Sequence, residues 1–314
     1  MSTCSRRTFI KTSSMLAMTG IVSPQLLASP PDSTNLLGQQ GVAPPFFAGV
    51  TNRPEVIAHR GGNGQWPGET MMAYNGAANI RADVLEMDVY LTKDDQLVLM
   101  HDKDVRTTTN GRGRIQTFTL NDIQELNAGY RWADGAGRFP YQKQLSALPE
   151  NLRRDLRVPS LREIFESFPK QRMVIEMKPA DRSPATALCK LIREFGKQDN
   201  VLVASFSGVY MQEFRSQCRE IATSVSLSLK DVTSFFAGKT TENQATSQAS
   251  VVQAPHHLVT EGLVRRAKDR RLKLHAWTVN NSDEMRRMQA LGVDGIITDY
   301  PGPLLALLNR TQPA

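Results

Sequence analysis

Short runs of β-forming, mostly apolar residues alternate with helical segments along most of this 314-residue chain. Eight such runs occur, at residues 55–60, 84–90, 97–101, 173–178, 201–206, 222–227, 273–279 and 295–298. Strands that alternate with helices favour a parallel sheet whose faces are covered by the helices. Eight of them in a chain of this length predict an α/β fold of the TIM (β/α)8 barrel type.

The pattern is interrupted between the second and third predicted strands. Only a turn at Asp94 and Asp95 separates these two strands. Parallel neighbours need a crossover of about a dozen residues, usually a helix. We therefore expect the second helix of the barrel to be short or missing, or to be replaced by an extended return.

Residues 102–158 form a long irregular stretch, which we interpret as an insertion after the third strand. Loops of this length are usually functional. The stretch contains four aromatic side chains, Tyr130, Trp132, Phe139 and Tyr141. These rings either line a substrate pocket or give the insertion a small core of its own. We expect residues 54–310 to form one domain that includes the insertion.

The second predicted strand carries two carboxylates in an otherwise apolar sequence. Glu86 and Asp88 are two positions apart, so both side chains point to one face of a strand. Bare carboxylates on a buried face resist desolvation, and a bound cation would relieve this. Glu176 and Lys178 repeat the spacing on the fourth predicted strand. We predict that Glu86, Asp88 and Glu176 bind one divalent cation, Mg²⁺ or Ca²⁺, which prefers oxygen ligands. The alternative is surface carboxylates on an amphipathic strand.

Two histidines lie at the ends of predicted strands and complete a metal-assisted phosphoryl site. His59 and His101 would be the catalytic acid–base pair, because imidazole titrates in the useful range. Arg60 and Lys178 would bind the phosphoryl oxygens of a substrate. Lys178 could instead form only a salt bridge with Glu176. Trp277 either lines the substrate pocket or is an ordinary core residue.

The motifs also occur in a characteristic order. They are His-Arg-Gly at 59–61, Glu-x-Asp at 86–88, His-Asp at 101–102, Glu-x-Lys at 176–178, Trp-Thr-Val-Asn at 277–280 and Gly-Val-Asp-Gly-Ile-Ile-Thr-Asp at 292–299. This ordered set resembles the glycerophosphodiester phosphodiesterase family, within the phospholipase-C-like phosphodiesterase barrels. The resemblance covers roughly residues 55–308. One departure is Pro-Gly-Glu-Thr at 67–70, where the family has Pro-Glu-Asn-Thr, so the acid is displaced to Glu69.

The resemblance implies metal-dependent hydrolysis of glycerophosphodiesters, which are deacylated phospholipids, to sn-glycerol 3-phosphate and an alcohol. Two alternatives remain open. One is lysophospholipase D or phospholipase D-like activity on the same barrel, which would need an apolar groove near the mouth. The other is a non-catalytic barrel that binds phosphate esters.

The first residues resemble an export signal. Residues 5–11, Ser-Arg-Arg-Thr-Phe-Ile-Lys, are similar to the twin-arginine motif, and a modestly apolar stretch follows. We expect residues 1–28 to be a twin-arginine signal peptide and residues 29–53 a linker or N-terminal strap. The apolar stretch is too short and polar for a stable membrane span. The protein is thus expected to use the twin-arginine export machinery and to be periplasmic or secreted.

Net charge and cysteine content bear on the partners of the protein and on the state of its thiols. The formal net charge is +7, and no basic run is interleaved with aromatic residues, so we expect no nucleic-acid partner. The expected partner is a small-molecule phosphodiester substrate. Cys189 and Cys218 lie in helical, partly apolar surroundings. They are interpreted as buried free thiols, with a disulfide as the alternative in an oxidising compartment.

Overall fold

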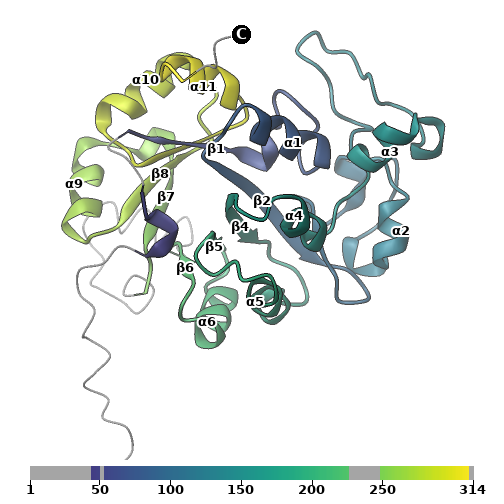
Figure 1. The fold of residues 1–314 in the computed structure, drawn as a ribbon, viewed down its shortest axis with the longest axis horizontal. Coiled ribbons are helices and arrows are strands. Elements are labelled where there is room, and N and C mark those ends of the chain that lie inside the picture. The colour runs from purple at the N-terminus through teal and green to yellow at the C-terminus, as the bar shows by residue number, and fades with distance from the viewer. Residues whose placement is uncertain (1–43, 50–52, 226–247, 311–314) are drawn as a thin grey trace, which may run out of the picture. The chain divides into compact units, whose positions relative to one another are not determined.

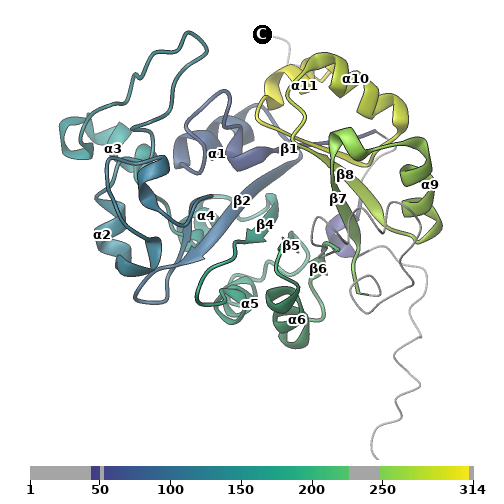
Figure 2. The same ribbon diagram turned by 180° about the vertical axis from the view of Figure 1, so that it is seen from behind.

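The computed structural model describes residues 44–49, 53–225 and 248–310. There the chain forms a ring of strands with helices around it (Figure 1; from behind in Figure 2). The barrel strands are β1 (Glu55–Ala58), β2 (Val84–Leu91), β4 (Arg172–Met177), β5 (Val201–Ala204), β6 (Ala222–Thr223), β7 (Val251–Pro255), β8 (Lys273–Trp277) and β9 (Gly295–Thr298). The α-helices are α1 (Met71–Asn79), α2 (Leu120–Gln124), α3 (Glu150–Leu156), α4 (Leu161–Ser167), α5 (Ala185–Glu194), α6 (Gly208–Gln217), α9 (Glu261–Asp269), α10 (Ser282–Leu291) and α11 (Pro301–Leu307). None of these helices is long and apolar enough to cross a membrane.

The eight barrel strands are all parallel and are hydrogen-bonded in the order β6-β5-β4-β2-β1-β9-β8-β7. The two ends of this sheet meet where Ser224 and Val251 form a parallel bridge. There the amide of Val225 donates to the carbonyl of Val251 over 2.8 Å. Inward-facing side chains such as Ile57 and Val174 fill the interior. The predicted TIM barrel is therefore confirmed.

The third predicted strand is not part of the barrel. β3 (Leu97–Leu99) runs antiparallel to β2, with Leu99 opposite Val89. The assignment of residues 97–101 as a barrel strand was therefore wrong, whereas the extended return in place of a second helix is confirmed. The missing barrel strand is β7, which sequence reasoning overlooked. Its five residues include the polar Gln253 and end in Pro255, and proline is unusual in a central strand.

The insertion between β3 and α4 builds small cores of its own. It contains α2, α3 and three short 3₁₀ segments, η4 (Val105–Thr107), η5 (Ile115–Thr117) and η6 (Leu145–Ala147). Val105, Ile115 and Ile123 belong to one buried cluster, while Leu148 and Leu156 belong to another. In the aromatic tract, the rings of Trp132 and Tyr141 pack on each other with centroids 6.0 Å apart. Tyr141 packs against the second of these clusters, whereas Trp132 lines a cavity, so both interpretations of the aromatic tract stay open.

The end of the barrel at which the strands begin is filled by the 3₁₀ segment η2 (Pro45–Phe47). Phe46 and Phe47 are buried in the interior cluster. Arg172, at the start of β4, donates from Nη1 to the carbonyl oxygen of Phe46 over 3.2 Å. This part of the predicted strap thus closes the barrel floor, and the site must lie at the opposite end. Of the predicted strap, residues 44–49 and Arg53 are described, and its other residues and the predicted signal peptide lie outside the described ranges.

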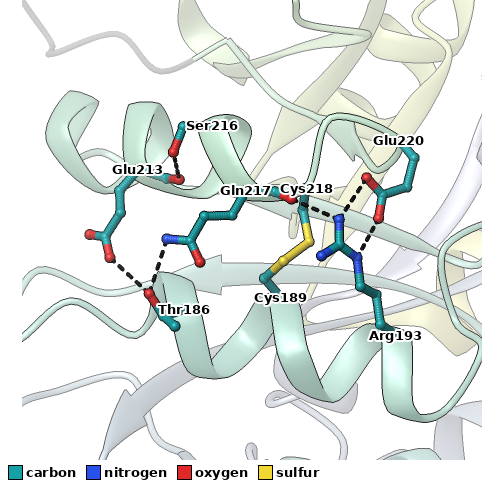
Figure 3. The surroundings of a disulfide bond; sticks show 8 residues. All are labelled: Thr186, Cys189, Arg193, Glu213, Ser216, Gln217, Cys218 and Glu220. Atoms are coloured by element: carbon teal, nitrogen blue, oxygen red, sulfur yellow. Dashed lines mark hydrogen bonds and ion pairs between the residues drawn. A yellow bond between two sulfur atoms is a disulfide. The ribbon is translucent and has the colours of Figure 1, made fainter.

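A disulfide joins helix α5 to the end of helix α6 (Figure 3). Its partners are Cys189 and Cys218, whose Cα atoms are 6.0 Å apart. Close by, Arg193 on α5 forms an ion pair with Glu220. The interpretation of the two cysteines as free thiols was therefore wrong, and the disulfide alternative holds. Disulfides of this kind stabilise a fold by about 2–4 kcal/mol.

Candidate active site

The predicted site residues gather at the carboxyl ends of the barrel strands, where barrel enzymes place their active sites. A central pocket lies there. Seven of the eight predicted residues line it: His59, Arg60, Glu86, His101, Glu176, Lys178 and Trp277. Asp88, the eighth, is only 1% exposed and forms ion pairs with Arg60 and Lys178. The structure thus brings all eight together, while their roles remain predictions.

The three predicted metal ligands form a compact buried cluster. Asp88 and Glu176 are register neighbours on β2 and β4, and Glu86 precedes Asp88 on the same face. One carboxylate oxygen from each residue lies within 4.8 Å of the others. Among the described residues, both oxygens of Asp88 and Oε1 of Glu176 are buried, and they have ion-pair neighbours but no well-aligned hydrogen bond. Buried anionic oxygens that are incompletely satisfied at this spacing fit a hard divalent cation.

Burial and mutual repulsion disfavour the ionised form of these carboxyl groups. Burial, followed by the charge of Asp88, raises the pKa of Glu176 to about 7. The same two causes raise the pKa of Glu86. Such shifts measure the free energy needed to hold negative charge here. A cation between the oxygens would reverse this balance and keep the carboxylates ionised.

Two side-chain cations flank the carboxylates. Lys178 places Nζ 2.9 Å from Oε1 of Glu176 and 3.3 Å from Oδ1 of Asp88. Arg60 places Nε 3.4 Å from Oδ2 of Asp88. Burial opposes the charge on Lys178, but Asp88 and Glu176 outweigh it and raise the pKa of the ammonium group. The salt bridge predicted as the alternative role of Lys178 therefore exists, and its cation still lines the pocket.

His59 and Arg60 lie on a tight turn after β1. Arg60 has a φ of 52°, in the left-handed region, and its amide donates to Oε2 of Glu86 over 2.8 Å. A strained residue of this kind persists where its surroundings hold it, commonly at functional sites. The turn therefore positions the histidine and the arginine against the carboxylate cluster.

His59 is held by a carboxylate that sequence reasoning did not assign. Its Nδ1 lies 2.6 Å from Oδ1 of Asp299, which follows β9. Asn280 in turn donates from Nδ2 to Oδ2 of Asp299 over 2.6 Å. Burial lowers the pKa of His59, but Glu86 and Asp299 outweigh it, so the pKa is raised. Because Nδ1 is engaged, Nε2 is the ring nitrogen left for the pocket. Both partners occur in the quoted motifs, which was the available signal.

His101 reaches the pocket because β3 runs back along β2. The amide of Met100 donates to the carbonyl of Asp88 over 3.0 Å, which places the next residue beside the carboxylates. Nδ1 of His101 lies 3.0 Å from Oδ1 of Asp102. Burial, together with the charges of Arg60 and Lys178, lowers the pKa of His101. The missing second helix is thus the reason that this histidine lies in the site.

Glu69, the carboxylate of the altered Pro-Gly-Glu-Thr motif, supports the strand that carries Glu86 and Asp88. It is buried, and its Oε1 accepts a hydrogen bond from the amide of Asp88 over 3.0 Å. Tyr74 donates its hydroxyl to Oε2 over 2.5 Å. Glu69 has a φ of 58°, so this strained position is also held by its contacts. The altered motif therefore keeps a carboxylate that contacts the strand of the predicted metal ligands.

The opposite wall of the pocket is apolar. Trp277 at the end of β8 packs edge-on against Phe206, with ring centroids 5.9 Å apart. Phe206 follows β5 and is 44% exposed, which is unusual for so large an apolar side chain. Val225 and Pro255 line the same pocket. Trp277 thus lines the pocket and also packs against the interior cluster, while its contact with substrate stays a prediction.

Comparison with known proteins agrees with this geometry. The model of the glycerophosphoryl diester phosphodiesterase family matches residues 59–303. The protein YhdW of Bacillus subtilis is 34% identical over 252 residues, which cover 78% of this chain and 94% of YhdW. A second Bacillus subtilis protein, named glycerophosphodiester phosphodiesterase, is 29% identical and is covered over 83% of its length, with 78% of this chain.

Solved structures show the same barrel. The structure of an Oleispira antarctica phosphodiesterase in complex with the product sn-glycerol-3-phosphate superposes with a TM-score of 0.66. The match covers 82% of this chain and 97% of that one, at 22% identity. At this identity the likeness supports the fold, while the sequence relatives support the family.

Proposed function

Because the chain belongs to the glycerophosphoryl diester phosphodiesterase family, and is thus a phosphoric diester hydrolase, we propose that it hydrolyses glycerophosphodiesters to sn-glycerol 3-phosphate and an alcohol. The observation that carries this proposal is the buried carboxylate cluster, whose oxygens lack well-aligned hydrogen bonds. Two side-chain cations and two histidines surround it on one pocket. Since both histidines and all three carboxylates are in place, a catalytic role is favoured over a barrel that only binds phosphate esters.

Glu86, Asp88 and Glu176 would hold one divalent cation, Mg²⁺ or Ca²⁺. When bound, such a cation supplies Lewis-acid polarisation of the phosphoryl group. Arg60 and Lys178, on either side of Asp88, would bind the phosphoryl oxygens and balance the charge that develops on them. The site thereby pairs negative groups for the metal with positive groups for the substrate.

His59 and His101 would move the protons that the reaction requires. One histidine removes a proton from the nucleophile, and the other gives a proton to the oxygen of the leaving alcohol. Each ring is oriented through Nδ1 by a carboxylate, Asp299 for His59 and Asp102 for His101. This leaves Nε2 of each ring for the exchange.

Replacing each histidine by alanine tests these roles. General acid–base catalysis contributes about 10²–10⁴-fold to rate, so each variant should lose activity on that scale with glycerophosphocholine. A p-nitrophenyl ester of phosphoglycerol has a leaving group that barely needs a proton. The variant that lacks the general acid should then be partly rescued, and the variant that lacks the base should not. Near-wild-type rates in both His59→Ala and His101→Ala would show that the histidines are structural.

A second candidate activity is lysophospholipase D, and the apolar wall favours it. Phe206 is 44% exposed and packs against Trp277, and both rings line the central pocket, where an acyl chain could lie. A comparison of lysophosphatidylcholine with glycerophosphocholine decides between the two activities. A Phe206→Ala variant should lose activity with lysophosphatidylcholine selectively if the wall binds the chain.

We also propose that the protein is exported by the twin-arginine machinery to the periplasm or beyond the cell. The leader lies outside the described residues, so support comes from its sequence and from the disulfide. Structural disulfides persist in oxidising compartments and are rare in the cytosol. The bond between Cys189 and Cys218 is therefore in keeping with an exported protein.

A further inference from the structure

The loop between β4 and α5 begins with Lys178, the predicted phosphate-binding cation. Pro179 and Ala180 follow it in the chain. Proline fixes its own φ at about −65° and restricts the backbone of the residue before it. The link from Ala180 back to Lys178 is therefore stiff, and a contact that fixes Ala180 also limits where Lys178 can lie.

Ala180 is fixed by the hydroxyl group of Tyr210 on α6. This hydroxyl donates a hydrogen bond to the carbonyl oxygen of Ala180 and accepts one from the amide of Ala180 over 3.3 Å. Tyr210 is itself placed in the first turn of α6, where its amide donates to Oγ of the N-cap Ser207 over 3.3 Å. Both contacts of the hydroxyl are partly buried, so their loss would leave backbone groups of Ala180 without these partners.

The helix that carries Tyr210 is anchored at both ends. At its start, the amide of Ser207 donates to Oγ of Ser205 over 3.1 Å, and Ser205 donates to the carbonyl of Met177 on β4 over 2.7 Å. At its end, the disulfide joins Cys218 to Cys189 on α5, the helix into which the loop leads (Figure 3). The loop and the helix that contacts it are therefore held to the same strand and to the same neighbouring helix.

Other side-chain contacts of the loop lie on the surface. Asp181 pairs with Arg114 over 3.4 Å, and Arg182 pairs with Asp95. All four side chains are exposed, and exposed ion pairs contribute little to stability. The partly buried contact with Tyr210 is therefore the better candidate for fixing the start of the loop.

The position of Lys178 matters because its present partners are also the predicted metal ligands. Nζ lies 2.9 Å from Oε1 of Glu176 and 3.3 Å from Oδ1 of Asp88. A divalent cation on this cluster would compete for these oxygens and repel the ammonium group. Attraction to the carboxylates then no longer fixes Lys178, and its backbone has to keep it in the pocket.

From these observations we propose that Tyr210 is a positioning residue, which fixes the loop after β4 so that the ammonium group of Lys178 faces the phosphoryl oxygens of the substrate. This rests on the proposed hydrolase function of the central pocket. In the described part of the chain, Tyr210 is not among the residues that line this pocket. It therefore acts through Lys178 and not by contact with the substrate.

The test is a double-mutant cycle on kcat/KM for glycerophosphocholine. Tyr210→Phe removes the hydroxyl group and keeps the ring, so kcat/KM should fall about twofold to tenfold, the effect of one lost neutral hydrogen bond. In the Lys178→Met background the same change should have no further effect, because the group that it positions is gone. Ser216→Ala is the control, since it removes an exposed hydroxyl group from the same helix, and it should leave kcat/KM at the wild-type value.

A second readout needs no turnover and separates this proposal from the proposed function. Acetylation of Lys178 by acetic anhydride is followed by mass spectrometry at one pH in Mg²⁺. Relative to Lys190, which is exposed on α5, the rate at Lys178 should rise about twofold to tenfold in Tyr210→Phe and stay at the wild-type value in Ser216→Ala. If no glycerophosphodiester is hydrolysed, the proposed function fails, and this rate alone decides the role of Tyr210. The positioning role is overturned by an unchanged acetylation rate in Tyr210→Phe, by an unchanged kcat/KM, or by an equal loss of kcat/KM in the Lys178→Met background.

Discussion

Replacing Glu176 by Gln is expected to stabilise the metal-free protein at alkaline pH. Burial and the charge of Asp88 raise the pKa of Glu176 from 4.5 to about 7 in the folded state. One pKa unit corresponds to about 1.4 kcal/mol, so ionised Glu176 lowers the free energy of unfolding by about 3 kcal/mol. The folded state binds more protons than the unfolded state between these two values. Stability is thus fully present below pH 4.5 and is lost as the pH rises through 7.

The assay is urea unfolding in the presence of chelator, from pH 4.5 to pH 8.5, with extrapolation to water. Wild type should lose stability over this range relative to Glu176→Gln, and the two curves should converge at the acid end. Glu166→Gln, at an exposed position on α4, controls for a general effect of the amide and should differ from wild type by less than about 0.5 kcal/mol. If Glu176→Gln is the less stable protein at pH 8.5 in chelator, the carboxylate cluster is not strained and the reasoning fails.

Addition of the cation should reverse the order of the two proteins. A ligand that binds only the folded state at 1,000 times its Kd adds about 4.1 kcal/mol to stability, which exceeds the deficit of about 3 kcal/mol. Wild type should gain this increment with Mg²⁺ or Ca²⁺, whereas Glu176→Gln, with one ligand oxygen replaced by a neutral amide, should gain much less. Equal gains in both proteins would place the cation elsewhere.

Three further predictions follow from the other parts of the structure. Changing both Arg6 and Arg7 to Lys should leave the precursor in the cytoplasm, and unchanged export in a fractionation assay would count against the twin-arginine route. Replacing Cys189 and Cys218 by Ala should lower the free energy of unfolding by about 2–4 kcal/mol, measured by urea titration without reductant, and no change would argue against the disulfide. Glu69→Ala leaves the amide of Asp88 and the hydroxyl of Tyr74 unpaired, so it should cost about 2–5 kcal/mol, while Glu69→Gln, which keeps an acceptor, should cost less.

The grouping of the site residues could be predicted because strand geometry is strongly constrained. Side chains two positions apart share a face, so Glu86 with Asp88 and Glu176 with Lys178 had to project together if both segments were strands. Parallel strands end at one edge of a barrel, which brought His59 to the same place. These steps need only local sequence patterns and the fold class.

The strand assignment failed where local patterns do not determine the partner. The apolar run at 97–101 has strand character, but nothing in it distinguishes an antiparallel return from a parallel barrel strand. β7 was overlooked because its short run contains Gln253 and Pro255, and its place is set by pairing with β8. The total of eight barrel strands was right although one member of the set was wrong.

Contacts between distant parts of the chain also could not be predicted from the sequence. The pairing of Asp299 with His59 spans 240 positions, and the disulfide depends on the 6.0 Å between two Cα atoms. The displaced acid Glu69 could be recognised as unusual, but its bond to the amide of Asp88 depends on the left-handed turn. A cavity lined by Trp132 of the insertion and Tyr300 after β9 likewise depends on how distant segments pack.

The most direct measurement follows glycerophosphocholine by ³¹P NMR with the purified mature chain, first in chelator and then after addition of Mg²⁺ or Ca²⁺. The account predicts no turnover in chelator and appearance of the sn-glycerol 3-phosphate signal on addition of the cation. Glu86→Gln should show no turnover under either condition, because it lacks one of the three clustered carboxylates. Full turnover in chelator, or no sn-glycerol 3-phosphate with either cation, would contradict the proposed metal-dependent hydrolysis.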